Sequence, residues 1–320
     1  MSDGAHLLIP FAAARDAGCR EAARQLELPQ LRRLLDRLEP AAADIGDERS
    51  LSPPHERALA GACGLAAPDG CIPWAAWQVQ QERRDEGGAG GEAWAWITPC
   101  HWHVAADHIV MRHPLDLRLD GEESGLLLAA MQPFFAQDGI ALEYHAPTRW
   151  LARGELFRGL AGASLDRVLG RDIDGWVPRS AAAAPLRRLQ QEMQMLLYTN
   201  AVNDARVRGG LLAVNSFWAS GTGALPGGQR AAPPAGLMMP QTLRDTALLQ
   251  DWSAWSAAWQ QVDAKQCGQL NASLDRGEQV TLTLCGESNA RSWSGRGSGW
   301  WRRIRGAVSR QPLLNLFETL

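Results

Sequence analysis

The spacing of apolar residues along the chain predicts where its helices and strands lie. A helix is predicted from Pro185 onward, because apolar residues recur at helical spacing and proline suits a first turn. Gly209-Gly210 would end this helix, 211–218 predicts a strand, and Gly221 with Gly223 predicts a glycine loop. The apolar positions of the helix are Leu186, Leu189, Met193, Leu196 and Leu197, and its polar exit carries Asn200, Asn203, Asp204 and Arg206.

Elsewhere, short apolar runs predict strands and longer periodic segments predict helices. The predicted strands cover 6–10, 93–97, 108–111, 140–144, 148–151 and 278–284, and the predicted helices cover parts of 26–38, a segment from 53, 121–135 and 242–262. Asp120 and Glu123 have the spacing of a capping box, and Pro133 would kink or end the helix that they open. Strands and helices are mixed throughout, which predicts an α/β fold with helices layered on a mixed sheet.

The chain is long enough for two subdomains. An alanine-rich segment at 180–185 suggests a boundary, which would divide the chain into 1–179 and 180–320.

Composition narrows the classes of partner. The 320 residues are 46% hydrophobic and 21% charged with a net charge of -3, which gives no general attraction to nucleic acid or anionic lipid. Lys265 is the only lysine, so arginine, which favours bidentate contacts to anions, carries almost all the positive charge. The six cysteines form no CxxC pair, and no apolar segment is long enough to span a membrane. We therefore expect a cytoplasmic protein with reduced thiols that binds neither nucleic acid nor a membrane.

Tryptophan-rich segments need a separate interpretation. Trp252, Trp255 and Trp259 fall on one helix face, and core packing explains that pattern best. The segment 292–310 mixes Trp with Arg, but it also has the pattern of an ordinary amphipathic helix, so nucleic-acid contact is the weaker interpretation.

A histidine cluster is the sharpest candidate for metal chemistry. In a strand, alternation would place His101 and His103 on one face with Asp107 and His108 nearby. Imidazole and carboxylate groups suit Zn, Mn or Fe, and an open coordination position would activate water or polarise a phosphoryl oxygen. The alternative is that these side chains only hydrogen-bond strand ends and loops.

The segment around Asn203-x-x-Arg206 and Asn215-x-x-Trp218-x-x-Gly221-x-Gly223 resembles the archaeal type of cofactor-independent phosphoglycerate mutase. With TPCHWHVAADHIVM at 98–111, APTRW at 146–150 and LTLCGE at 282–287, the chain is more similar to a bacterial group described as cofactor-independent phosphoglycerate mutases or regulators of pathogenicity factors. The resemblance implies either an active metal-dependent mutase or related phosphotransferase, or a catalytically degenerate relative that binds a small phosphorylated or carboxylated metabolite and regulates. The second is favoured, because no metal-ligand Asp followed by a nucleophilic Ser or Thr is recognisable.

A ligand site is predicted where the helix exit meets the glycine loop. Asn203, Arg206, Asn215 and the backbone of Gly221 and Gly223 would converge there, with Arg206 binding the anion. Under this hypothesis Arg206→Gln abolishes binding and leaves stability nearly unchanged. Alternatively, both asparagines cap backbone turns and Arg206 pairs with an acid. The glycine spacing does not fit a dinucleotide fingerprint, so we expect no nucleotide cofactor.

Overall fold

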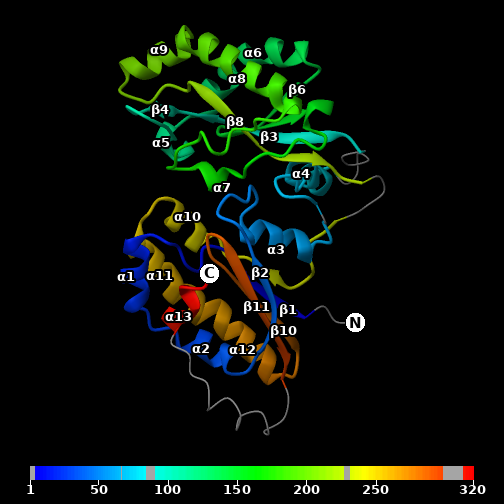
Figure 1. The fold of residues 1–320 in the computed structure, drawn as a ribbon, viewed down its shortest axis with the longest axis vertical. Coiled ribbons are helices and arrows are strands. Elements are labelled where there is room, and N and C mark those ends of the chain that lie inside the picture. Colours follow the sequence, from blue (N-terminus) through cyan, green and yellow to red (C-terminus); the bar gives the residue numbers. More distant parts are fainter. Residues whose placement is uncertain (1–3, 66, 84–90, 227–230, 298–312) are drawn as a thin grey trace. The chain divides into compact units, whose positions relative to one another are not determined.

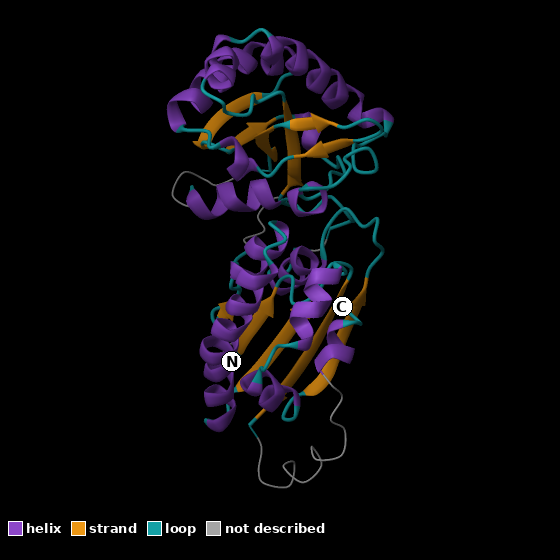
Figure 2. Cartoon of the chain, turned by 90° about the vertical axis from the view of Figure 1, so that its left-hand side faces the viewer, coloured by secondary structure: helices purple, strands orange, loops and turns teal. Residues whose placement is uncertain are grey.

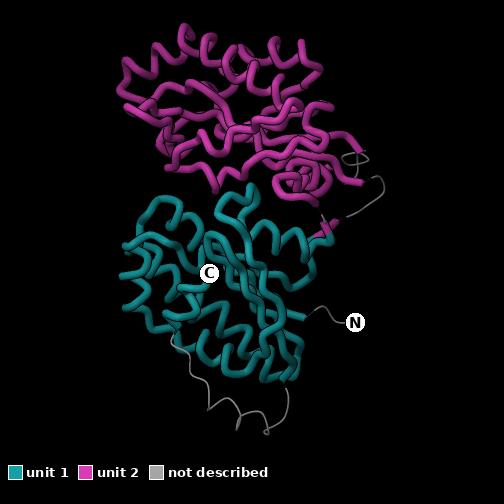
Figure 3. Tube along the Cα trace, in the orientation of Figure 1, with its two compact units in different colours: residues 1–64, 233–320 teal, residues 65–232 magenta. Residues whose placement is uncertain are grey.

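The computed structural model of the protein describes residues 4–65, 67–83, 91–226, 231–297 and 313–320. The chain forms two compact units (Figure 3). Unit 1 comprises residues 1–64 and 233–320, and unit 2 comprises residues 65–232. Figure 2 shows that each unit is built from strands with helices packed against them, which confirms the predicted α/β class.

Unit 1 contains a five-stranded mixed sheet of order β2-β11-β10-β1-β9 (Figure 1). Its strands are β1 (Ala5–Ile9), β2 (Glu39–Ile45), β9 (Leu237–Met238), β10 (Gln279–Cys285) and β11 (Asn289–Arg296). Its helices are α1 (Ala17–Arg24), α2 (Pro29–Leu35), α3 (Pro54–Ala62), α10 (Thr242–Leu248), α11 (Trp252–Val262), the π-helix η4 (Asp263–Cys267), α12 (Gly268–Asp275) and α13 (Leu313–Phe317). Strand β1 runs parallel to both β9 and β10, whereas β11 runs antiparallel to β10 and β2.

Alternation along the central strands of unit 1 separates two apolar layers. Leu7 and Ile9 of β1 join Leu282 of β10 in the main core, together with buried residues of α2, α11 and α12. Leu8 points to the other face and packs with Cys285 and α3. The tryptophan stripe of α11 belongs to the main core, as predicted.

Side chains of α11 fix the segment that follows β1. Trp255 and Trp259 are 0% exposed, and their indole N–H groups donate to the carbonyls of Phe11 (2.9 Å) and Ala12 (3.2 Å). These two bonds satisfy the polar atoms of large buried rings and hold the chain at the carboxyl end of β1.

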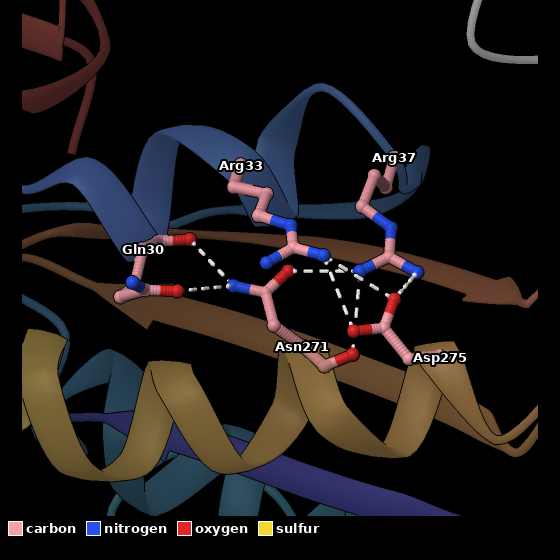
Figure 4. Close-up of polar contacts among 5 residues, drawn as sticks. All are labelled: Gln30, Arg33, Arg37, Asn271 and Asp275. Atoms are coloured by element: carbon pink, nitrogen blue, oxygen red, sulfur yellow. Dashed lines mark hydrogen bonds and ion pairs between the residues drawn. The ribbon is translucent and has the colours of Figure 1, made fainter.

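Polar contacts join α2 to α12 and its preceding turn. Buried Asp263 accepts hydrogen bonds from the backbone N–H groups of Gln30 (3.1 Å) and Leu31 (2.7 Å), which caps a helix whose own N-cap residue, Leu28, has no polar side chain. Figure 4 shows the rest of the network, in which Asp275 pairs with Arg37 (2.8 Å). Arg33 also pairs with Asp275. The side chain of Asn271 accepts a hydrogen bond from Arg37 and donates hydrogen bonds to the backbone and side-chain oxygens of Gln30.

Unit 2 contains a four-stranded antiparallel sheet of order β6-β7-β3-β8 and a small hairpin of β4 and β5. Its strands are β3 (Ala93–Cys100), β4 (Trp102–Val104), β5 (Ile109–Met111), β6 (Ala141–Ala146), β7 (Arg149–Arg153) and β8 (Ser216–Ala224). Its helices are α4 (Trp74–Glu82), α5 (Pro114–Leu117), α6 (Gly121–Gln137), the 3-10 turn η2 (Glu155–Phe157), α7 (Leu165–Val168), the 3-10 turn η3 (Ala181–Ala183), α8 (Ala184–Tyr198) and α9 (Ala201–Arg208).

One face of the larger sheet in unit 2 carries the core. Ala95 and Ile97 of β3 and Phe217 of β8 pack against buried residues of α6 and α8. These include Leu127, Leu128, Met131 and Phe135 of α6 and Leu186, Leu189, Met193 and Leu197 of α8. The apolar helix period that the sequence predicts for 186–197 therefore faces this sheet. Among the described residues, no helix is both long enough and apolar enough to cross a membrane.

Several predicted elements differ from the structure at their ends. The capping box of Asp120 and Glu123 is present, but α6 continues past Pro133 to Gln137, because its apolar face is buried on both sides of the proline. The helix predicted over 242–262 is two helices, since Gln250 has a positive φ of 56° and Asp251 caps α11. The segment that carries the Asn/Arg motif is also two helices, α8 and α9, with Asn200 as the N-cap of α9.

The two units divide the chain at other places than the predicted boundary near residue 179. Strand β1 is hydrogen-bonded between β9 and β10, so the beginning and the end of the chain belong to one sheet. The alanine-rich segment is no linker, because Ala183 and Leu186 lie in the core of unit 2. Residues 298–310 of the Trp/Arg-rich segment lie outside the described residues.

Candidate functional site

The histidine cluster lies on and beside the β4–β5 hairpin of unit 2. His101 precedes β4, and its Nδ1 lies 2.8 Å from the carbonyl oxygen of Ala213. His103 is exposed, and its ring stacks near that of His101 with centroids 6.5 Å apart. The contact with the carbonyl of Ala213 orients the ring of His101. Such a contact to a loop is what we expect if the cluster only hydrogen-bonds strand ends and loops.

The remaining members of the cluster, and His113 beyond it, bond locally. His108 Nδ1 lies 2.6 Å from Asp107 Oδ1, and this hydrogen bond, with the charge of the imidazole, lowers the pKa of the exposed Asp107 carboxyl. His113 caps α5 by accepting from the backbone N–H of Leu115. Within the described ranges, no three His, Cys, Asp or Glu side chains are arranged to hold one metal ion. A metal role for His101, His103, Asp107 and His108 therefore stays a prediction.

Asn203 is 4% exposed and bonds backbone on two sides. Its Nδ2 donates to the carbonyls of Leu197 (2.8 Å) and Val214 (2.7 Å), and its Oδ1 accepts from the N–H of Val214 (2.9 Å). The side chain thereby fixes the segment before β8 to the end of α8.

Asn215 joins the two segments that the sequence singles out. Its Oδ1 accepts from the N–H of Trp102 (2.7 Å), and its Nδ2 donates to the carbonyl of the same residue (2.9 Å). The histidine hairpin and the Asn/Arg segment, which the predicted boundary would separate, are thus neighbours in unit 2.

Arg206 is 1% exposed and is bonded in three directions. Its Nε donates to the carbonyl of Leu212 (2.9 Å), one terminal nitrogen donates to the carbonyl of Leu117, and the other pairs with Glu123. Glu123 also completes the capping box of α6. The guanidinium therefore connects α9, α5 and α6 inside the unit, and its acidic partner is Glu123 rather than the neighbouring Asp204.

The two glycines predicted to form a loop lie inside strand β8. Gly221 has a φ of 60°, and a Cβ there would lie 2.9 Å from Cε3 of Trp96. Gly223 has a φ of 137°, and its Cβ would lie 3.0 Å from Cβ of Pro73. Both glycines permit close packing of β8 beside α4. The two glycines thus pack against Trp96 and Pro73, whereas Asn203 and Asn215 bond the backbone of other segments.

A groove of about 610 Å³ on unit 2 is lined by two residues of the predicted ligand site, Asn203 and Asn215. It is bounded by the β4–β5 hairpin, the end of α8, α9 and the segment before β8, and it contains Asn203 and Asn215 but neither Arg206 nor the two glycines. Its lining comprises Trp102, Val104, Ile109, Gln194, Leu197, Tyr198, Asn203, Asp204, Val207, Arg208, Ala213 and Asn215. Most of these side chains are apolar.

A smaller pocket, of about 330 Å³, lies in unit 1 at the carboxyl ends of the parallel strands β1 and β10. It is lined by Ala13, Ala14, Arg15, Cys19, Arg20, Ala23, Glu287, Asn289, Leu314, Phe317, Glu318 and Leu320. Small ligands of α/β proteins bind preferentially at this edge of a sheet. The sequence reasoning did not select this pocket, although Arg15 and Arg20 follow the first predicted strand and Glu287 follows the last.

Charged groups of the unit 1 pocket differ in how they are paired. Arg15 pairs with Glu48, and its backbone N–H donates to Glu287 (3.2 Å). Arg20 donates to the carbonyl of Arg15 (2.8 Å) and forms no ion pair with any residue that the structure describes. Burial raises the pKa of the Cys19 thiol to about 11, so this group is protonated at neutral pH.

Comparisons with known proteins give distant likenesses of fold. No protein-family model matches the sequence, and no curated protein matches it. A cofactor-independent phosphoglycerate mutase from Thermoplasma acidophilum aligns over 99% of this chain and 98% of its own, with 13% identity and a TM-score of 0.37. The PH0037 protein from Pyrococcus horikoshii aligns over 95% of this chain and 93% of its own, with 11% identity and a TM-score of 0.48.

Proposed function

We propose that the protein is a phosphoglycerate-mutase-like, catalytically degenerate protein that binds a small phosphorylated or carboxylated metabolite in the unit 1 pocket and acts in regulation. The observation that carries this proposal is the position of Arg20, which lines the pocket and has no carboxylate partner among the described residues. A guanidinium offers paired donors and a permanent charge, which suit a phosphate or carboxylate group.

The acidic residues of the pocket favour a ligand that carries hydroxyl groups as well as an anionic group. Glu287 and Glu318 lie in the same pocket as Arg15 and Arg20, so its formal charges balance. Carboxylates accept hydrogen bonds from hydroxyl groups, whereas they repel a bare anion. A hydroxylated acid, with its anionic group at Arg20, fits this combination better than inorganic phosphate does.

The thiol that lines the pocket is poorly suited to act as a nucleophile. Cys19 is the thiol in its lining, and the raised pKa keeps that thiol in its poorly nucleophilic form. The alternative function, an active metal-dependent phosphoglycerate mutase or related phosphotransferase, follows from the sequence resemblance, and a separate assay of turnover tests it.

Calorimetric titration of the full chain with 3-phosphoglycerate and, separately, inorganic phosphate tests the proposal. We expect 3-phosphoglycerate to bind more tightly than phosphate. Arg20→Gln is expected to weaken binding at least about tenfold, because it removes a charge-assisted contact. Arg24→Gln is the matched control, since Arg24 is on the same helix, pairs with Glu21 and does not line the pocket.

Three results would count against the proposal. Absence of binding, or equal binding by Arg20→Gln and the unaltered protein, would exclude this pocket as the site. Conversion of 3- to 2-phosphoglycerate at ordinary enzyme rates in a coupled assay with added Mn would establish the alternative, catalytic function.

A further inference from the structure

Exposed apolar side chains from three elements line the unit 2 groove. Val104 of β4 is 72% exposed, Tyr198 of α8 is 86% exposed and Val207 of α9 is 62% exposed. Single exposed apolar residues are common on monomers, whereas several that line one groove are typical of a contact surface. The groove is therefore a candidate for contact with another macromolecule.

Two opposite charges lie beside Val207 in the same groove. Asp204 and Arg208 are four residues apart on α9, both are exposed, and both line the groove. In the part of the chain that the structure describes, neither side chain forms an ion pair. The surface thus presents one acid and one base, separated by about one helical turn, next to an apolar residue.

We propose that this groove is the contact between two copies of the chain, with the α9 helices antiparallel across a two-fold axis. A two-fold axis brings residue i of one copy to residue j of the other and residue j to residue i. An axis that crosses α9 between Asp204 and Arg208 therefore forms two equivalent ion pairs from one acid and one base. Val207 and Tyr198 of each copy then cover the apolar lining of the other.

The charge pattern favours a second copy over an unrelated partner. An unrelated partner would need its own base and acid at the spacing of Asp204 and Arg208, whereas a second copy supplies both. In this arrangement the ion pairs lie next to the axis, and the apolar side chains of the groove lie beside them on each copy. This surface is separate from the unit 1 pocket in its residues, so the proposal stands independently of the proposed metabolite.

Sedimentation velocity of the full chain over a concentration series tests the proposal by charge exchange. The unaltered protein is expected to form a reversible dimer. Asp204→Arg and Arg208→Asp should each weaken dimerisation at least about tenfold, because each places like charges together twice. The double variant Asp204→Arg/Arg208→Asp restores opposite charges and should return the dissociation constant to within about threefold of the original. Glu122→Arg is the control, an acid in the first turn of another helix, α6.

An apolar series separates the groove from the rest of the surface. Val207→Ser and Tyr198→Ser should weaken dimerisation, whereas Leu126→Ser, at a 54% exposed residue of α6, should not. Far-ultraviolet circular dichroism checks that each variant is folded. A protein that stays monomeric up to its solubility limit would overturn the proposal. A dimer that survives the single charge reversals, or a double variant that fails to re-form it, would also overturn it.

Discussion

Arg206 in unit 2 and Arg20 in unit 1 differ in what surrounds their guanidinium groups. Arg206 is enclosed and bonds two carbonyls and a carboxylate, whereas Arg20 is exposed, lines a pocket and bonds one carbonyl. An arginine with all its directions occupied holds elements together, and one with free donors can bind a ligand. Both residues are helical arginines, so residue type does not distinguish these roles, whereas burial does.

The largest effect is expected from breaking the buried contacts of Arg206. Arg206→Met keeps much of the side-chain volume but leaves Glu123 and two carbonyls without their donor. Loss of one partner of a buried pair typically costs about 3–5 kcal/mol, so we expect a decrease of that size in the free energy of unfolding. Urea denaturation measures it at low protein concentration, where association does not contribute.

Arg208→Met is the control for this variant, since Arg208 is exposed on the same helix. Its effect on unfolding should stay within about 0.5 kcal/mol. If Arg206→Met were as mild as its control, the contacts of Arg206 would not stabilise the unit. If the variant also abolished binding of 3-phosphoglycerate, Arg206 would be a ligand residue as the sequence hypothesis states.

Asn203→Ala should have the next largest effect. It removes three hydrogen bonds and leaves both backbone groups of Val214 without a side-chain partner inside the unit. We expect the free energy of unfolding to fall by roughly 2–3 kcal/mol. Asn215→Ala, at a half-buried residue, should cost about 1 kcal/mol, and an equal or larger cost there would contradict this ranking.

A smaller effect, which depends on pH, is expected in the sheet of unit 1. Burial lowers the pKa of His6, whose Nε2 lies 3.0 Å from Oγ1 of Thr283. The unfolded chain therefore binds a proton on His6 at a higher pH than the folded protein does. The contribution of His6 to the free energy of unfolding is complete above its unfolded pKa of 6.5 and is lost as the pH falls below that value.

Denaturation at about pH 7.5 and about pH 5.5 tests this dependence in the unaltered protein and in His6→Gln. The stability difference between the two proteins should shift in favour of His6→Gln at the lower pH. The same difference at both values would show that His6 does not change its protonation on unfolding in this range.

The smallest effect on stability is expected at Arg20. Arg20→Gln removes an exposed charge and should change the free energy of unfolding by less than about 0.5 kcal/mol, in contrast to Arg206→Met. Thermal denaturation of this variant beside Arg24→Gln measures the difference. A large loss of stability would place Arg20 in the same structural class as Arg206 and would remove the contrast.

Local patterns in the sequence predicted local structure well. The capping box at Asp120 and Glu123 and the apolar face of α8 depend on residues within a few positions of each other, and both are present. Helix breaks were harder to predict. The turn at Gln250 and the cap at Asn200 interrupt segments whose apolar period is continuous, since a period identifies a face but not where a helix stops.

The mixed α/β class, the buried tryptophans and most of the strands are predictable from the sequence, because each follows from the alternation or period of neighbouring residues. Which ends of the chain share a sheet and which polar groups meet depends on the tertiary structure. Arg206 pairs with Glu123, which is 83 residues away in the sequence, and β1 pairs with β10 near the other end of the chain. Such pairings depend on how whole elements pack, and a one-dimensional pattern does not contain that information.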